Sequence, residues 1–390
     1  MTTGSISGEM AEDLPLVGRR GVFEELLEIL RTVRKSEVGA VVISGPAGSG
    51  KTAVLDLFLE HCRTGVRGVR VLSAMGDEWE AQFPLAGYSQ LMLTTPLRSA
   101  KDYDGGPHVP SGPVAALTPA QVVNYASTLS AHLEGLQSHG TVVVAVDDVH
   151  KLDAESLHIL TFVMRRLHGK RILFLLTINP DDATRVPVGA LDFLSGHQVT
   201  RIPLDPLTPQ QVQHLARATL GIDLSATAAH GLVQHTGGIA QPVVELLREL
   251  PAETWQSWFP SLPPTSRVRA RTRSVLAAAS PGLVSLAEAA SVLKRSAGLP
   301  EVSQVSGLES VMEVLDEGHR AGLLGLTVDQ ARSSVVFFEP GTAEAIYEQI
   351  VPSRRIALHR LAAVAVQPEG ERLGHRVSAT PGADEALAEE

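Results

Sequence analysis

The sequence predicts an α/β protein in which a three-layer domain with a parallel sheet precedes a mostly helical region. Three observations favour this class. Short apolar runs alternate with helical patterns over residues 14–204, which is typical of parallel strands joined by helices. A glycine-rich turn separates the first such run from the helix after it. Beyond residue 204 the strand patterns nearly vanish, so we expect the α/β domain to end there.

Each element of the α/β domain is predicted from a local pattern. The run Ala40–Ser44 (AVVIS) is apolar and bounded by glycines, as in a strand buried on both faces. The pair Thr118-Pro119 predicts a helix start, because threonine caps well and proline fits the first helical position. The segment 100–117, rich in Gly, Pro and Asp, is expected to be a mobile loop. Strands are expected at 40–44, 69–74, 141–146, 172–177 and 198–202, and helices at 21–34, 52–62, 118–136 and 154–168.

The rest of the chain is expected to be helical apart from one hairpin. The run Thr208-Pro209-Gln210-Gln211 predicts a capping box, and with it a helix to about residue 220. Two short strand patterns, at 322–327 and 334–338, stand among helical patterns. Three helices with a small hairpin are the pattern of a winged helix, which we predict for this region. Further helices are expected at 226–235 and 241–250, and a linker at 260–264.

Length and composition exclude several classes of function. With 390 residues the chain exceeds one ordinary core, so we expect two or three domains. The net charge of −10 argues against non-specific nucleic-acid binding by the whole chain, since no excess of cations can displace phosphate counterions. The single Cys62 rules out an internal disulfide framework and favours a cytoplasmic location. We expect no signal peptide and no membrane contact, because no apolar stretch reaches the ~18 residues of a membrane span.

The glycine-rich turn matches G-x-x-x-x-G-K-[ST], the phosphate-binding loop (P-loop) of nucleotide-binding proteins. Its glycines let consecutive backbone N–H groups point at an anion, and the helix that follows adds its positive N-terminal dipole. Lys51 is expected to reach the β- and γ-phosphates of ATP. The hydroxyl of Thr52 is expected to bind Mg²⁺, a hard cation that prefers oxygen ligands. The whole cradle is expected to comprise Pro46, Ala47, Gly48, Ser49, Gly50, Lys51 and Thr52.

A pair of carboxylates follows the most strand-like run of the chain. The run 141–146 ends in Asp147-Asp148, and parallel strands deliver such groups to the carboxyl edge of the sheet, where ligands bind. Asp147 is expected to hold Mg²⁺ together with Thr52. Asp148 is expected to polarise the attacking water, which makes Asp148 and Lys51 the candidate catalytic residues. The alternative is that Asp148 or Asp153 only caps the next helix.

Two more polar residues stand at strand ends. The strand at 172–177 should lie beside the strand that carries the P-loop, so Asn179 can sense the γ-phosphate by hydrogen bonding. The alternative is a turn residue before Pro180. His150 is expected on the surface at a helix start, with a contact to a partner subunit as the alternative.

Together these motifs resemble a known family. The opening Leu16–Arg19, the P-loop and the run Val144–Asp153 (VAVDDVHKLD) are similar to signal-transduction ATPases with numerous domains (STAND). More narrowly, they resemble the ATP-binding region of large LuxR-type transcriptional regulators of bacteria. The similarity continues, in order, through Pro203-Leu204, His235–Gly238, Glu245-Leu246, Phe337–Pro340 and Arg354–Arg360.

The resemblance implies further nucleotide contacts. Val17 and Gly18 would line the adenine pocket, Arg19 would stand near the nucleotide, and Pro242 would join the cofactor-binding residues. The chain departs from its relatives at Asn179, where they often carry Arg. It departs again at Glu339, where they often carry a His that touches the ADP phosphate. A carboxylate at this position would repel a phosphate rather than bind it.

The resemblance also implies a function and a domain order. The expected function is an ATP/ADP- and Mg²⁺-binding regulatory switch, with slow hydrolysis of ATP to ADP and phosphate and self-association on ATP binding. DNA would be bound only through a C-terminal domain that these 390 residues do not include. The alternatives are a non-hydrolysing ADP-bound signalling scaffold and an AAA-type remodelling ATPase. The expected domains are a disordered tail (1–13), a P-loop nucleotide-binding domain (14–204), a helical domain (205–260), a winged-helix domain (261–367) and the start of a truncated helical region (368–390).

Overall fold

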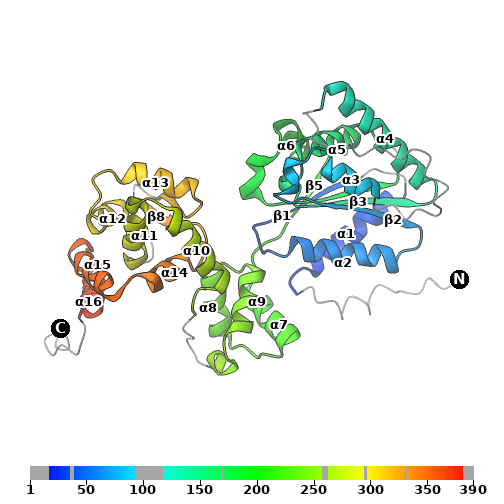
Figure 1. The fold of residues 1–390 in the computed structure, drawn as a ribbon. Coiled ribbons are helices and arrows are strands. Elements are labelled where there is room, and N and C mark those ends of the chain that lie inside the picture. Colours follow the sequence, from blue (N-terminus) through cyan, green and yellow to red (C-terminus); the bar gives the residue numbers. More distant parts are fainter. Residues whose placement is uncertain are drawn as a thin grey trace. The chain divides into compact units, whose positions relative to one another are not determined.

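The structure is a computed structural model that describes residues 17–35, 39–93, 117–167, 170–256, 262–293, 297–329 and 332–380. The expected tail, nearly all of the expected loop at 100–117, the start of the expected linker and residues 381–390 lie outside the described residues. The chain divides into two compact units (Figure 1). The first unit comprises Met1–Gly221 with Ile239–Gln241, and the second comprises Ile222–Gly238 with Pro242–Glu390.

The first unit is built on a sheet of five parallel strands in the order β2-β3-β4-β1-β5. This confirms the predicted α/β class with its parallel sheet. It also confirms that the strand before Asn179 lies beside the strand that carries the P-loop. The strands are β1 (Gly39–Ser44), β2 (Val69–Met75), β3 (Thr141–Asp147), β4 (Ile172–Ile178) and β5 (Thr200–Pro203).

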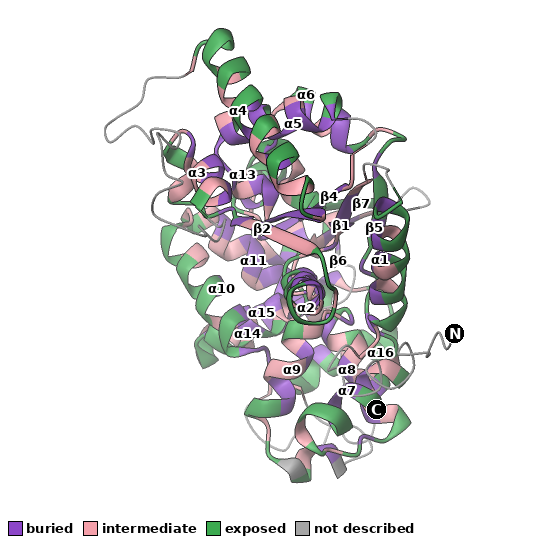
Figure 2. Ribbon diagram, turned by 90° about the vertical axis from the view of Figure 1, so that its right-hand side faces the viewer, coloured by how far each residue is buried: buried purple, intermediate pink, exposed green. Residues whose placement is uncertain are grey.

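Helices cover both faces of this sheet (Figures 1 and 2). In β3, Val143 and Ala145 face one apolar core, while Val142, Val144 and Val146 face the other. Both faces of β3 and β4 are therefore buried, which explains why these strands read as unbroken apolar runs. The first core contains α1 (Arg20–Val33) and α2 (Lys51–Thr64), and the second contains α3 (Ala86–Leu93), α4 (Pro119–Gln137), α5 (Ala154–Arg166) and α6 (Val188–Leu194).

Side-chain caps set several helix starts. Thr208 forms the predicted capping box on α7 (Pro209–Leu220). Thr118 is the predicted N-cap of α4, and with Gln121 it also forms a capping box, which was not predicted. Asp153 is the N-cap of α5, as the capping alternative proposed. Its carboxylate also accepts hydrogen bonds from the N–H groups of Leu85, at 2.9 Å, and Gly87, at 3.0 Å. Asp153 thus ties α5 to α3, a short helix that the sequence patterns did not predict.

The second unit contains a three-stranded antiparallel sheet in the order β6-β8-β7. The predicted hairpin is confirmed as β7 (Leu324–Asp329) and β8 (Arg332–Phe337). Strand β6 (Ala297–Gly298) was not predicted because two residues carry no periodic pattern. The helices are α8 (Ala226–Thr236), α9 (Ala240–Glu249, whose first two residues group with the first unit), α10 (Ser266–Ala278), α11 (Pro281–Leu293), α12 (Leu299–Ser306), α13 (Val311–Arg320), α14 (Thr342–Gln349), α15 (Pro352–Ala365) and α16 (Glu369–Ser378).

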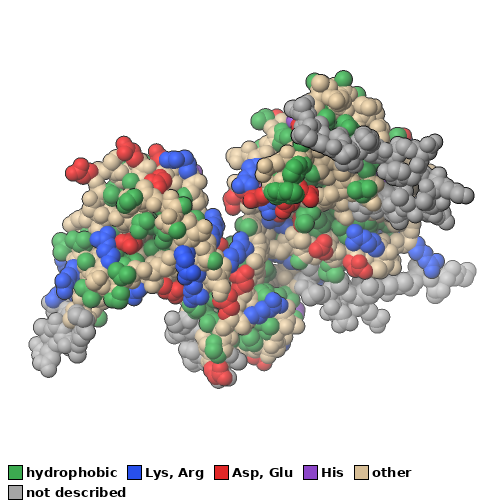
Figure 3. Space-filling model, viewed as in Figure 1, with side chains coloured by type: hydrophobic (Ala, Val, Ile, Leu, Met, Phe, Trp, Pro, Cys, Tyr) green, Lys and Arg blue, Asp and Glu red, His purple; other side chains and the backbone are tan. Residues whose placement is uncertain are grey.

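Two features of the structure concern the charge of the surface and the apolar character of the helices. Acidic and basic side chains are interspersed on the face of the two units that Figure 3 shows. Among the described helices, none combines the length and apolar character that crossing a membrane requires.

Candidate functional site: the P-loop and the acidic strand end

The P-loop connects β1 to α2 and adopts a conformation that depends on glycine. Gly48 and Gly50 have φ values of 80° and 97°, a left-handed region that disfavours other residues. Gly45 serves a different purpose, because a Cβ there would lie 2.7 Å from the Oγ of Ser49. The first residue of α2 is Lys51, and Gly50 before it provides no side-chain cap. The first N–H groups of α2 lack acceptors within the helix, which makes this end a natural place for an anion.

Lys51 is buried at the base of the loop, with 6% of its surface exposed. Its Nζ donates to the carbonyl oxygens of Gly45, at 2.8 Å, and Pro46, at 3.0 Å. The pKa of the Lys51 ammonium is lowered, because the effect of burial outweighs the opposite effect of the nearby carboxylates of Asp148 and Asp147. The side chain is thus folded onto its own loop. Its predicted contact with the β- and γ-phosphates stays a prediction.

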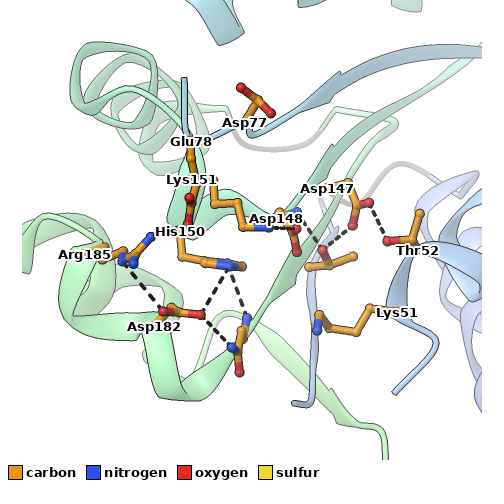
Figure 4. A network of polar contacts seen from close by, with 12 residues as sticks. Lys51, Thr52, Asp77, Glu78, Asp147, Asp148, His150, Lys151, Asp182 and Arg185 are labelled. Atoms are coloured by element: carbon orange, nitrogen blue, oxygen red, sulfur yellow. Dashed lines mark hydrogen bonds and ion pairs between the residues drawn. The ribbon is translucent and has the colours of Figure 1, made fainter. Parts of the chain in front are cut away.

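Thr52 and Asp147 meet across the carboxyl edge of the sheet (Figure 4). The Oγ1 of Thr52 donates to Oδ2 of Asp147 at 2.7 Å, and Asp147 is 7% exposed. The two residues predicted to hold Mg²⁺ are therefore in contact. Asp147 ends β3 and Thr52 lies in the first turn of α2, which follows β1 and the P-loop. Strand β4 lies between β3 and β1 in the sheet, so the parallel strands bring both residues to the same edge.

Thr177 also contacts the acidic pair, and the sequence analysis did not identify it. Its hydroxyl donates to Oδ1 of Asp147 and accepts the backbone N–H of Asp148 at 2.8 Å. A signal was available, because Thr177 is the single polar residue in the otherwise apolar strand β4 (ILFLLTI).

Asp148 occupies an unusual backbone conformation, with φ 50° and ψ 55°. This left-handed region is uncommon for residues other than glycine and is often found at functional sites. The Asp148 carboxylate accepts a hydrogen bond from Nζ of Lys151 at 2.8 Å and makes no side-chain cap. The capping alternative therefore holds for Asp153 and not for Asp148.

His150 and Asp182 lie in a second polar cluster beside the acids (Figure 4), and Asn179 contacts both of them. The side-chain oxygen of Asn179 accepts the N–H of Asp181 at 3.3 Å, as expected of a turn residue, and Nδ2 donates to Asp182 at 2.6 Å. His150 is 5% exposed, so its predicted surface position is wrong. Its Nδ1 accepts the N–H of Asn179 at 3.4 Å, and its Nε2 lies 3.7 Å from Asp182. Burial lowers the pKa of His150, which the surrounding carboxylates only partly offset.

Arg19 also contacts the P-loop. Its guanidinium donates to the carbonyl oxygens of Ser49, at 3.1 Å, and Asp205, at 2.7 Å. Gly18 has a φ of 74°, and a Cβ there would lie 2.9 Å from the side chain of Leu207. The segment at residues 17–19 therefore packs beside the loop, where the adenine contacts of Val17 and Gly18 were predicted.

Two other predicted positions lie in the second unit. Pro242 follows Gln241, whose backbone N–H donates to the carbonyl of Gly48 at 3.0 Å within the first unit. Glu339 forms an ion pair with Arg271, with Nη1 and Oε2 2.6 Å apart. The contacts of Pro242 and Glu339 with a nucleotide stay predictions.

The donor set fits a magnesium–nucleotide complex. The Oγ of Ser49 is buried in the loop without a hydrogen-bond partner, the end of α2 has no side-chain cap, and both Thr52 and Asp147 offer oxygen. Mg²⁺ binds nucleotides through one or two protein oxygens, with water and phosphate completing its shell. Among the described residues, no group of three or more His, Cys, Asp or Glu side chains is placed to hold a metal ion.

The comparisons with known proteins agree with this geometry. A family model described as the AAA ATPase domain matches residues 15–175, which include the P-loop, the acidic pair and most of β4. The matched part of the chain is thus a P-loop ATPase domain of the AAA type. No curated protein matches the chain.

Several solved structures are similar in outline. The Aeropyrum pernix ORC2 protein, in ADPNP–ADP complexes, is 14% identical with a TM-score of 0.48, over 89% of this chain and 94% of that one. The A. pernix ORC1 protein in complex with DNA is 16% identical with a TM-score of 0.47, over 88% and 95%. The RuvB Holliday junction branch migration motor of Thermotoga maritima is 13% identical with a TM-score of 0.37, over 82% and 92%.

Proposed function

We propose that the chain is an ATP/ADP-binding regulatory switch of the STAND class, from a bacterial transcriptional regulator of the LuxR type. The contact between Thr52 and Asp147, 2.7 Å long at the end of an uncapped helix, is the observation that carries nucleotide binding. The match of residues 15–175 to the AAA ATPase domain supports the same conclusion. The STAND and LuxR assignment rests on the order of motifs along the sequence.

In this proposal each group at the site has one role. The backbone of residues 46–52 and the Lys51 ammonium bind the phosphates, and Thr52 and Asp147 hold the metal. Mg²⁺, when bound, neutralises negative charge on the phosphates. Asp148 accepts a proton from the attacking water, and Asn179 contacts the γ-phosphate. Val17, Gly18 and Pro242 contact the nucleoside, and Arg19 holds the Ser49 end of the loop.

The second unit is proposed to contain a winged helix. The order α11-β6-α12-α13-β7-β8 with an antiparallel sheet supports this. We place its domain at residues 261–367, after a helical domain at 205–260. In the proposed switch, ADP favours the closed form and ATP permits self-association. DNA would be bound by a separate domain.

Nucleotide binding is tested by calorimetry on the wild type and two lysine variants. The wild type should bind ATP and ADP. Lys51→Ala should lose at least about 100-fold in ATP affinity, since it removes a charge-assisted contact that the buried site cannot replace. Lys35→Ala removes an exposed lysine of the same unit and should bind like the wild type. Unchanged ATP affinity in Lys51→Ala would contradict the proposal.

Hydrolysis is tested separately with Asp148→Asn. This variant should bind ATP normally and release phosphate more slowly, because an amide cannot act as a base. Equal phosphate release by the variant and the wild type would refute the role of Asp148.

An AAA-type remodelling ATPase is the second candidate, favoured by the AAA family match. Fast turnover stimulated by a polymer substrate would support it. A non-hydrolysing scaffold would instead purify with tightly bound ADP that does not exchange, and would release no phosphate. Measuring nucleotide content and phosphate release on one preparation separates the three possibilities.

A further inference from the structure

The residue that links the two carboxylates is Thr177, near the carboxyl end of β4. It is fully buried, with 0% of its surface exposed, in a strand whose other residues are all apolar. A buried hydroxyl is unfavourable unless it is hydrogen-bonded. This one both accepts and donates: Oγ1 accepts the N–H of Asp148 at 2.8 Å and donates to Oδ1 of Asp147.

Each of these two hydrogen bonds of Thr177 fixes a group of the proposed ATP site. Because Oδ1 of Asp147 is held by Thr177, the other oxygen, Oδ2, is turned toward the hydroxyl of Thr52. Because the N–H of Asp148 is also held, the left-handed turn at φ 50° has a fixed partner on the neighbouring strand. This conformation costs free energy for any residue other than glycine, although less for Asp than for most, and it persists where the surroundings hold it.

We propose that Thr177 is a positioning residue of the ATP site: its one hydroxyl orients the Asp147 carboxylate for the metal and holds the turn that carries Asp148. The inference rests on the function proposed above. Thr177 touches neither nucleotide nor metal and acts through the two acids. Its predicted effect is therefore on the magnesium dependence of binding and on turnover, while magnesium-free nucleotide binding by the P-loop persists.

Two substitutions separate the hydroxyl from the shape of the side chain. Thr177→Val keeps the shape and removes the hydroxyl, whereas Thr177→Ser keeps the hydroxyl and removes a methyl group. The matched control is Thr161→Val on α5, which also replaces a buried threonine. The hydroxyl of Thr161 donates only to the Leu157 carbonyl of its own helix, at 2.7 Å, away from the acids.

The first measurement needs no ligand. Hydrogen exchange of the Asp148 amide in the nucleotide-free, full-length protein should be at least about tenfold faster in Thr177→Val than in the wild type, because its acceptor is gone. Thr177→Ser and Thr161→Val should exchange at the wild-type rate. Equal exchange in Thr177→Val and the wild type would overturn the proposed hold on the turn.

The second measurement uses ATP with and without Mg²⁺. Thr177→Val should bind ATP without Mg²⁺ like the wild type, lose most of the gain in affinity that Mg²⁺ provides, and hydrolyse ATP about 100-fold more slowly. Thr177→Ser should recover most of both properties. A wild-type response to Mg²⁺ in Thr177→Val would overturn the proposal. So would an equal loss of magnesium-free binding and thermal stability in both Thr177 variants, which indicates a structural role only. If the wild type itself binds no ATP, the proposed function fails, and the exchange experiment still decides whether the hydroxyl holds the turn.

Discussion

The ammonium group of Lys151 lies 2.8 Å from a carboxylate oxygen of Asp148, the residue proposed to polarise the attacking water. Both side chains are partly exposed, and the hydrogen bond to Asp148 raises the pKa of Lys151. The pair draws the Asp148 carboxylate toward η3 (Val149–Lys151), so it competes with any role of this carboxylate toward water.

We expect Lys151→Met to speed phosphate release by up to about fivefold. A partly exposed ion pair contributes about 1 kcal/mol or less. If the pair must break before Asp148 can act on water, that free energy is part of the activation barrier, and Lys151→Met removes it. Single-turnover phosphate release measures the effect, and ATP affinity should not change. Lys151→Arg preserves the charge and serves as the control. A rate equal to or below that of the wild type would show that the ion pair does not restrain Asp148.

Asp182 restrains the side chain of Asn179, because the Nδ2 group donates to it at 2.6 Å. If Asn179 senses the γ-phosphate, this contact must open when ATP binds. Asp182→Ala should therefore raise the affinity for ATP about two- to tenfold and leave the affinity for ADP unchanged, as expected for the loss of one hydrogen bond to a charged group. The adjacent exposed residue provides the control variant Asp181→Ala. An unchanged ratio of ATP to ADP affinity would contradict contact between Asn179 and the γ-phosphate and would favour the alternative that Asn179 is only a turn residue.

Cys62 is fully buried on α2, and burial raises the pKa of its thiol to about 12 from an ordinary value of 9.0. The folded state therefore favours the protonated thiol, and its stabilising contribution is complete below pH 9 and is lost as the pH rises toward 12. At pH 8 an alkylating reagent should react with Cys62 only after unfolding. Mass spectrometry with and without urea measures this, and rapid alkylation of the native protein would contradict the burial of Cys62.

Arg271 joins two parts of the second unit, because it pairs with Glu339 at 2.6 Å and donates to the carbonyl of Gly322 at 3.2 Å. Arg271→Gln should destabilise the second unit by about 1 kcal/mol, the usual size for a partly exposed pair. The loss should shrink at high salt, which screens the pair in the wild type. Hydrogen exchange around β7 and β8 reports it. Arg273→Gln, on the same helix, is the control and should show no salt-dependent change.

The sequence by itself determined the parts of this protein that depend on local pattern. The alternation of strands and helices to residue 204, the helix caps at Thr118 and Thr208, and the P-loop with Lys51 and Thr52 are all encoded by residues close together in the chain. The pairing of Thr52 with Asp147 could also be anticipated, because parallel strands end at a common edge. Hydrophobic periodicity and turn chemistry act over a few residues, so they can be read without the fold.

Only the tertiary structure decided which groups surround the acidic pair. Thr177 meets Asp147 because β4 also pairs with β3, in a register that no local pattern states. The burial of His150 and the restraint of Asn179 by Asp182 depend on how the loops after β3 and β4 pack together. Arg19 reaches Ser49 across 30 positions of sequence for the same reason. Contacts between distant residues follow from the order of strands and the closeness of packing, and both are fixed only when the chain has folded.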